Sequence, residues 1–211
     1  MRRLTCSIPL AFLVGIAVTP MTAQTKKVQF GVTGGVNFAT WTGDDVGSGA
    51  KRRTGFTGGG MVTMSLSPAA AVQTGLRYSQ EGTGADLGGG ISGSFKVDYL
   101  RVPLYLKVGT KLQGTTPIYP HLYAGPAVGF KVRCKIEASS GGQSAEVDCD
   151  DPSLQAKVKS TDFGVHFGVG VDIGHFNLGG RYELGLTSID DSGGGADIKN
   201  SVLAVVAGYD F

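Results

Sequence analysis

The chain has 211 residues, a length that fits one domain. Its 35 glycines are far above average, but the absence of a Gly-X-Y period excludes collagen, and abundant aromatic and β-branched residues exclude a disordered chain. The sequence holds 19 Lys and Arg against 17 Asp and Glu, and two of the basic residues, Arg2 and Arg3, lie in a segment that we expect to be removed. The mature chain would then carry 17 of each sign and be formally neutral, so nucleic-acid binding has no electrostatic support.

Residues 1–24 are predicted to be a secretory signal peptide. Arg2 and Arg3 precede a short apolar core at residues 10–18 (LAFLVGIAV), and cleavage is expected after Ala23 or the residue that follows it. The alternative is an uncleaved anchor, but nine apolar residues are too few to span about 30 Å of hydrocarbon. The mature domain is therefore expected to be residues 25–211.

The mature domain alternates between apolar and small or polar residues with a period of two, which is typical of strands with two different faces. The segment after Thr161 is the clearest case, because Phe163 and Phe167 lie on one face and Asp162 and His166 on the other. No later stretch approaches 18 apolar residues, so no transmembrane helix is predicted. Eight strands are predicted in chain order, at about residues 28–38, 56–66, 72–78, 99–108, 119–131, 162–173, 176–186 and 202–211.

Long and short connections alternate between these strands. The short ones lie near Ser67, at 109–116 and near Gly174, whereas the long ones are polar and glycine-rich. This succession is typical of outer-membrane barrels, in which the short turns face the periplasm. An even strand count then places both termini on the periplasmic side. The long connections are candidate surfaces for an envelope protein partner: residues 39–53, 82–94, 133–159 and 187–197.

The composition of the polar face favours a barrel in lipid over a soluble sandwich. That face is mostly glycine with interspersed charges, which suits the narrow interior of an eight-stranded barrel. The apolar faces would then meet outer-membrane lipid, and the sheet must close because an open edge is not tolerated in hydrocarbon. Aromatic residues near the strand ends fit interfacial girdles, or ordinary strand propensity: Phe38, Trp41, Tyr78, Tyr99, Phe130, Phe163, Tyr209 and Phe211.

The predicted fold is therefore an all-β, eight-stranded, antiparallel up-and-down transmembrane β-barrel of the bacterial outer membrane. Two alternatives remain open. One is a narrow porin or channel for small solutes, and the other is a secreted, soluble, calycin-like barrel that binds an apolar ligand.

Two strands carry a resemblance to a known family. Residues 99–107 (YLRVPLYLK) resemble the Y-L-x-(I/V)-P-L-x-x-K strand of the PorT-like outer-membrane β-barrel family, and residues 123–130 (YAGPAVGF) resemble its next strand. Tyr209 and Phe211 are similar to the C-terminal aromatic signal that the barrel-assembly machinery reads. The resemblance covers roughly residues 28–211 and implies the fold, the location and a contact with that machinery during biogenesis. Named members are linked to secretion and gliding, whereas most are barrels without an assigned role.

Seven charged side chains are expected to point into the barrel. An eight-stranded lumen is normally filled, so these residues are predicted to form a buried network rather than an ion pathway. Such a network replaces lost hydration only if nearly every member is paired. Its members are Arg77, Glu81, Asp98, Arg101, Lys107, Arg181 and Glu183.

Cys134 and Cys149 bracket the longest connection, and Cys6 is lost with the signal peptide. An even pair in an oxidising compartment predicts a structural disulfide, worth about 3 kcal/mol for a loop of about 15 residues. Metal ligation or free thiols are the alternatives.

Nothing in the sequence predicts catalysis, a metal or a cofactor. His121 and His166 should both face inward, but if Ile118 lies level with Ile173 the two histidines are about 13 Å apart, too far to share a metal ion. No Ser-His pairing on adjacent strands and no G-x-S-x-G elbow occurs, and the aspartates of the loops match no EF-hand. The predicted function is a non-enzymatic barrel of structural or partner-interaction type.

Overall fold

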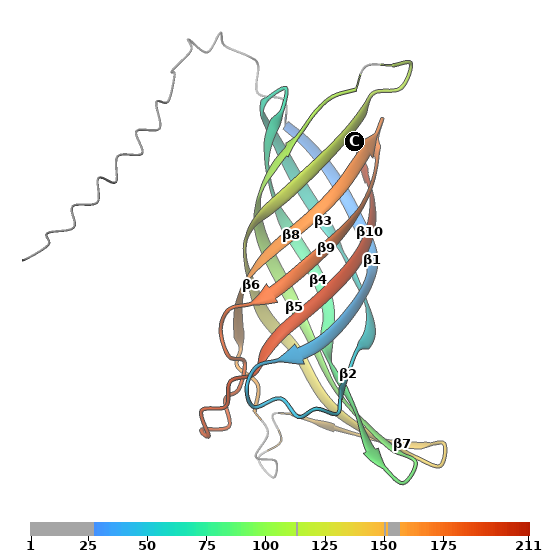
Figure 1. Cartoon of the computed structure of the whole chain (residues 1–211), viewed down its shortest axis with the longest axis vertical. Coiled ribbons are helices and arrows are strands. Elements are labelled where there is room, and N and C mark those ends of the chain that lie inside the picture. Colours follow the sequence, from blue (N-terminus) through green and yellow to red (C-terminus); the bar gives the residue numbers. More distant parts are fainter. Residues whose placement is uncertain (1–27, 113, 150, 152–156) are drawn as a thin grey trace, which may run out of the picture.

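The structure is a computed structural model that describes residues 28–112, 114–149, 151 and 157–211 (Figure 1). Within these ranges no helix is long and apolar enough to cross a membrane. The expected signal peptide, residues 1–24, lies outside the described residues. The strands are β1 (Val28–Thr42), β2 (Ala50–Lys51), β3 (Arg53–Ser67), β4 (Ala70–Gly88), β5 (Ile91–Gly109), β6 (Ile118–Ser140), β7 (Gln143–Asp148), β8 (Thr161–Ile173), β9 (Phe176–Gly185) and β10 (Lys199–Asp210).

Eight of these strands form a closed antiparallel ring. Each pairs with its neighbours in the order β1, β3, β4, β5, β6, β8, β9 and β10, and the last strand pairs with the first, for example Val205 with Val36. The pairing of β4 with β5 completes the ring. The short strands β2 and β7 lie outside it, and among the described residues β2 pairs with β4 and β7 with β6. The predicted eight-stranded up-and-down architecture is therefore confirmed.

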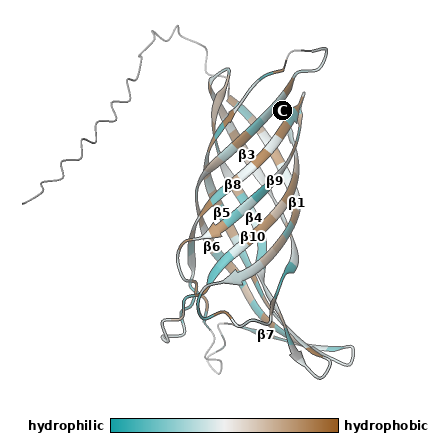
Figure 2. Ribbon diagram, in the orientation of Figure 1, coloured by the Kyte–Doolittle hydropathy of each residue, from teal (hydrophilic) through white to brown (hydrophobic). Residues whose placement is uncertain are grey.

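Apolar and polar residues alternate along the strands (Figure 2), and the exposures show that the apolar side chains point outward and the polar ones inward. In β8, Phe167 is 50% exposed, whereas the neighbouring His166 is 1% exposed. The same alternation leaves large apolar side chains such as Phe30 and Leu122 exposed on the outer wall. The calycin-like alternative, which requires the apolar faces to point inward, is contradicted by this arrangement.

Glycine on the inner faces makes room for aromatic rings of the neighbouring strand. A Cβ atom at Gly168 would overlap the ring of Tyr123, and one at Gly170 would lie 2.7 Å from Nε2 of His121. The glycine-rich polar face of the sequence thus follows from the small diameter of the barrel, because the lumen has no room for a large side chain at every inward position.

Residues 82–94 were predicted to form a long loop, and this prediction is wrong. β4 and β5 continue to pair as far as Gly88 and Ile91, and a tight turn at Gly89 and Gly90 joins them. Both turn glycines have positive φ (62° and 78°), a conformation that glycine adopts without steric cost. The glycine-rich composition therefore marks the turn of a long hairpin, not a long loop.

The other long connections are also more ordered than predicted. β1 extends to Thr42, β6 extends to Ser140, and β7 folds back on β6 within residues 133–159. Between β9 and β10 the chain is irregular, with one bridge between Asp190 and Val158. We call the extension of residues 82–88, 91–97, 132–140 and β7 beyond the ring the protruding sheet (Figure 1).

The two ends of the barrel differ. Val28 and Asp210 lie at one end together with the turns at 68–69, 110–117 and 174–175, and we call it the terminal end (Figure 1). The protruding sheet and the connections 43–52 and 186–198 lie at the other, the loop end (Figure 1).

A small apolar core closes the loop end. Trp41 packs against it, and its ring lies 4.8 Å from that of Phe95. Tyr99 is fully buried in this core, so its assignment to an interfacial girdle is wrong, because odd-numbered positions of β5 point inward at this level. The buried members of the core are Val97, Tyr99, Cys134, Cys149, Val158 and Ile189.

Candidate functional site

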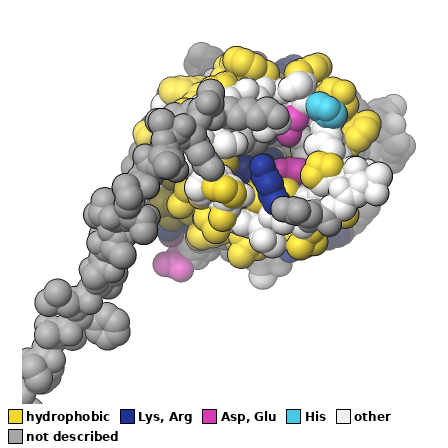
Figure 3. Space-filling view, turned by 90° about the horizontal axis from the view of Figure 1, so that it is seen from above, with side chains coloured by type: hydrophobic (Ala, Val, Ile, Leu, Met, Phe, Trp, Pro, Cys, Tyr) yellow, Lys and Arg dark blue, Asp and Glu magenta, His cyan; other side chains and the backbone are white. Residues whose placement is uncertain are grey.

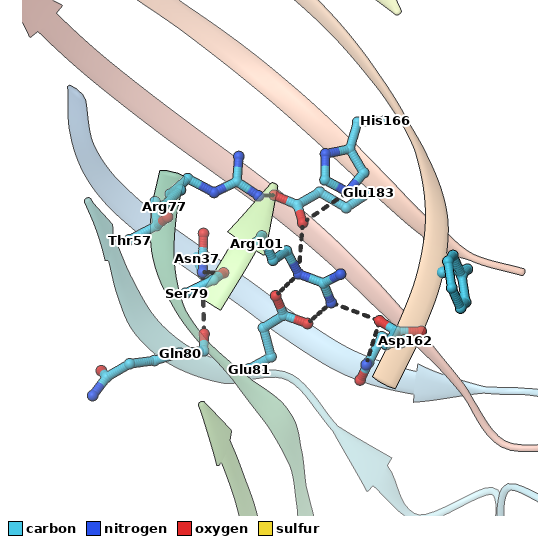
Figure 4. Close-up of polar contacts among 12 residues, drawn as sticks. Asn37, Thr57, Arg77, Ser79, Gln80, Glu81, Arg101, Asp162, His166 and Glu183 are labelled. Carbon is cyan, nitrogen blue, oxygen red and sulfur yellow. Dashed lines mark hydrogen bonds and ion pairs between the residues drawn. The ribbon is translucent and has the colours of Figure 1, made fainter. Parts of the chain in front are cut away.

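The lumen is the candidate site, and Arg101 of β5 lies at its centre (Figure 4). Its guanidinium forms a two-point ion pair with Glu81, with Nε and Nη2 each 2.5 Å from a carboxylate oxygen. Nη2 also donates to Oδ2 of Asp162 at 2.7 Å. Asn200 donates to the same Asp162 oxygen at 3.0 Å. One arginine therefore joins β4, β5 and β8 across the barrel.

A second group of contacts gathers around Glu183 of β9. Oε1 of Glu183 accepts from Nη2 of Arg77 at 2.8 Å and from Nε of Arg181 at 2.7 Å. Oε2 lies 3.3 Å from Nε2 of His166 and 3.6 Å from Nε of Arg101, which links this group to the first (Figure 4).

These buried charges fill the central lumen. A charge that leaves water is tolerated when opposite charges and hydrogen bonds surround it, and each ionised group named so far has such partners. The hydroxyl of Tyr105 extends the set, 2.7 Å from Nδ1 of His166. We call the following residues the lumen plug: Arg77, Glu81, Arg101, Asp162, His166, Arg181 and Glu183.

Five of the predicted network residues belong to the lumen plug, and two do not. Lys107 lies nearer the terminal end, with Nζ 3.3 Å from Oδ2 of Asp172. Asp98, predicted to point inward, instead accepts from the hydroxyl of Tyr78 at 2.6 Å and lies 4.0 Å from Arg133. The reason is parity: Val97 and Tyr99 point inward, so Asp98, although only 2% exposed, lies on the other face of the sheet with Tyr78.

The predicted charge network left out three polar residues that line the lumen: Asp162, Asp172 and Asn200. Asp162 and Asp172 stand on the polar face of the most regular predicted strand, so the alternation itself was the signal that places them inside. Asn200 precedes the segment that was predicted as the last strand, so its face was not assigned.

The terminal half of the lumen is hollow. An inner chamber of about 50 Å³ adjoins the lumen plug, and Arg77, Tyr105, Lys107, His121 and Arg181 are among its lining residues. A wider vestibule of about 420 Å³ follows toward the terminal end, with Lys107, Lys111, Tyr119 and Asp172 among its lining residues. Figure 3 views this end and shows basic and acidic side chains inside the rim.

The two inward histidines lie at different levels. His121 pairs in register with Gly170 and His166 with Gly125, which confirms the predicted pairing of Ile118 with Ile173. No group of three or more metal-ligating side chains occurs among the described residues. His166 contacts Glu183 and Tyr105 instead.

Cys134 and Cys149 form a disulfide, with Cα atoms 5.4 Å apart. Both cysteines are buried in the apolar core of the loop end. The disulfide thus ties β6 to the chain that follows β7, beside Val97 and Tyr99 of β5.

The C-terminal aromatic side chains lie on the outer wall at the terminal end. Phe211 is 70% exposed, and its ring lies 5.5 Å from that of Tyr209. The Tyr209 ring also meets that of Phe176 edge to face at 5.2 Å.

A closed ring with an apolar exterior and a charged interior defines the class of outer-membrane β-barrel proteins. Residues 22–191 match the family described as "Outer membrane protein beta-barrel domain". The chain belongs to this family and is a protein of the bacterial outer membrane, where its outer wall meets lipid. No curated protein matches the sequence.

Among the solved structures that match this chain, three are similar to it over nearly their whole length. Ail of Yersinia pestis, in complex with the heparin analogue sucrose octasulfate, is 18% identical and has a TM-score of 0.43, with 88% of this chain and 99% of that one covered. Neisserial surface protein A is 12% identical with a TM-score of 0.45, covering 86% and 97%. OprG of Pseudomonas aeruginosa is 15% identical with a TM-score of 0.41, covering 88% and 97%. With identities below 25% and TM-scores below 0.5, these structures say nothing about what this chain binds.

Proposed function

We propose that this protein is a non-conducting, non-enzymatic barrel with a structural or partner-interaction role in the outer membrane. The observation that carries the proposal is the lumen plug, in which Arg101 reaches Glu81 and Asp162 from a third strand and closes the centre of the lumen. The apolar core around Trp41 and Cys134 adds a second closure at the loop end. These two closures in series are the reason for assigning no conductance to the barrel.

Electrical recording in planar lipid bilayers tests the proposal. The refolded wild-type protein is expected to give no unitary current steps, whereas Arg101→Ala combined with Trp41→Ala opens space in both closures and is expected to give measurable steps. Steps of uniform size from the wild-type protein would overturn the proposal and establish the second candidate, a channel for small solutes. The hollow chamber and vestibule are the observation that favours this second candidate.

One arrangement of side chains in the lumen resembles a catalytic one. Tyr105, His166 and Glu183 lie in hydrogen-bonding series, but all three are buried and Glu183 is already shared by arginines. A general base needs a substrate within hydrogen-bond reach, and the lumen plug occupies that position. The same three residues are therefore assigned to holding the barrel together.

The protruding sheet is the surface that we assign to a partner in the envelope. All six residues of β7 are exposed, and β7 pairs with β6 alone among the described strands. A photo-crosslinking residue at Ser144 is expected to capture a discrete envelope protein in cells, whereas one at the lipid-facing Phe167 is expected to capture none. Equal results at the two positions would contradict a partner at this surface.

The orientation of the chain is part of the proposal. We place the terminal end in the periplasm and the protruding sheet outside the cell, because long connections face outward in barrels of this kind. An impermeant maleimide applied to whole cells should label Gly142→Cys and spare Lys111→Cys. The reverse pattern would overturn the orientation.

Biogenesis and closer kinship complete the proposal. The exposed Tyr209 and Phe211 are assigned to recognition by the barrel-assembly machinery. Residues 1–24 are assigned to export as a signal peptide. The resemblance of residues 99–107 and 123–130 supports kinship with the PorT-like family. Phe211→Ala is expected to lower the amount of folded protein in the outer membrane, with unchanged folding in detergent. Unchanged amounts would remove the assembly role.

A further inference from the structure

We propose that the inner chamber binds one small, freely diffusing oxyanion, a carboxylate or a phosphate, on a floor formed by Arg77 and Arg181. This goes beyond the proposed function, which assigns no ligand to the lumen.

The floor of the chamber carries more positive than negative charge. Arg77 and Arg181 share a single carboxylate, Glu183, which also lies within 3.6 Å of Arg101. Arg101 in turn has two carboxylates of its own, Glu81 and Asp162. The lumen plug as a whole balances three arginines against three carboxylates, but the half that lines the chamber has two arginines for one carboxylate.

Both arginines also keep an unused donor. Nε of Arg77 and Nη2 of Arg181 are buried and have no hydrogen-bond partner among the residues that the structure describes. The two side chains are 1% and 4% exposed, and both line the chamber. A buried donor without an acceptor is costly, and an anion on the floor would supply the missing acceptor. Guanidinium groups bind carboxylate and phosphate well because their planar donors match two oxygens at once.

The volume of the chamber limits the size of the ligand. Its volume is about 50 Å³, and a single water needs roughly 10–15 Å³ on the same measure, so the chamber accommodates a few non-hydrogen atoms. Tyr123 and Lys107 supply further donors in its wall. The vestibule connects the chamber with the terminal end, since Lys107, Asp172 and Asp210 line both spaces. The two aspartates in this passage repel polyanions more than monoanions, so the site favours a ligand of low charge.

Calorimetric titration of the refolded mature chain with inorganic phosphate, and separately with acetate, tests the proposal at constant ionic strength. Wild-type protein is expected to bind one anion saturably. Arg181→Gln removes the unused donor and is expected to weaken binding at least tenfold. Val206→Phe fills the chamber without changing any charge, and it is expected to abolish binding. Lys135→Gln, at the loop end, is the matched control and should bind as wild type does.

Each variant is first checked for its heat-modifiable gel shift, so that a misfolded barrel is not counted. If Arg181→Gln fails to fold, Val206→Phe tests the proposal alone. No saturable binding to the wild type, or binding that survives the filled chamber, would overturn the proposal. A short-chain phosphatidylglycerol is titrated as a separate arm. Inorganic phosphate should bind and this lipid should not, because the chamber lies inside the ring of strands. Equal binding of the lipid would place the anion site outside the lumen, and this result would also overturn the proposal.

Discussion

Arg77 and Arg101 are directly opposite each other on β4 and β5, with both side chains inside the barrel. Like charges in this position repel, and the two guanidinium groups turn to different carboxylates, Arg77 to Glu183 and Arg101 to Glu81 and Asp162. The arginine pair therefore determines how the lumen plug is divided into two halves, and it explains why the half around Arg77 and Arg181 faces the chamber with positive charge.

Removal of Arg101 should destabilise the barrel strongly. Arg101→Ala leaves Glu81 and Asp162 buried without their main partner, and breaking a buried pair in this way costs about 3–5 kcal/mol. Urea unfolding in detergent, followed by tryptophan fluorescence, measures the change. Arg101→Met combined with Glu81→Met and Asp162→Asn should lose much less, since it leaves no unpaired charge. Equal losses in the single and triple variants would contradict the charge argument.

Loss of the disulfide should loosen the loop end and leave the ring intact. Cys134→Ser with Cys149→Ser removes a cross-link over 15 residues, worth about 3 kcal/mol in the chain-entropy model. We expect faster proteolysis within residues 141–160 and an unchanged heat-modifiable shift. A barrel that no longer folds would show instead that the disulfide is needed for the ring itself.

A charge on the outer wall should be costly in a bilayer. Phe167 points outward from the middle of β8, and an arginine near the bilayer midplane costs about 2–4 kcal/mol. Phe167→Arg is compared with Ser144→Arg, whose position on β7 lies beyond the ring. Unfolding free energies in lipid vesicles should fall only for the first variant, and a negligible cost at Phe167 would contradict its contact with lipid.

An added methyl group inside the ring should be poorly tolerated. Gly168→Ala places a Cβ atom against the Tyr123 ring, and overpacking of this kind costs about 1–3 kcal/mol. Tyr123→Ala in the same chain should relieve much of the cost of the added methyl group. A double-mutant cycle measures this coupling, and additive effects would mean that the two positions do not share space.

Outside the membrane, Lys51 should control the ionisation of Asp86. The Lys51 ammonium donates to Asp86 at 2.9 Å and, with the Gly88 N–H, lowers the pKa of the carboxyl below its ordinary value. Their contribution is therefore present above the ordinary pKa of aspartate and is lost as the pH falls through the lowered value. Lys51→Met should raise the pKa of Asp86 in a carboxyl-carbon NMR titration. An unchanged pKa would assign the shift to Gly88 alone.

Alternation was sufficient to predict the eight strands of the ring and most of their faces, and closure followed because an open edge is not tolerated in hydrocarbon. A period of two leaves one face for lipid and one for the lumen, and the glycine content of the inner face indicates a narrow barrel. The same logic placed Arg77, Arg101 and Glu183 inside, and spacing along the chain suggested that Cys134 and Cys149 could meet.

The partners within the lumen, by contrast, depended on register. Whether Arg101 meets Glu81, Asp98 or Asp162 depends on which residues of three strands share one level, and alternation specifies a face but not a level. The length of the β4–β5 hairpin was also set by tertiary structure, since a polar, glycine-rich sequence is compatible with a loop or with strands beyond the membrane. The sequence by itself thus determined the class of protein and its faces, whereas the structure decided the ion pairs, the closed loop end and the hollow terminal half. These depend on contacts between residues far apart in the chain, which no local pattern specifies.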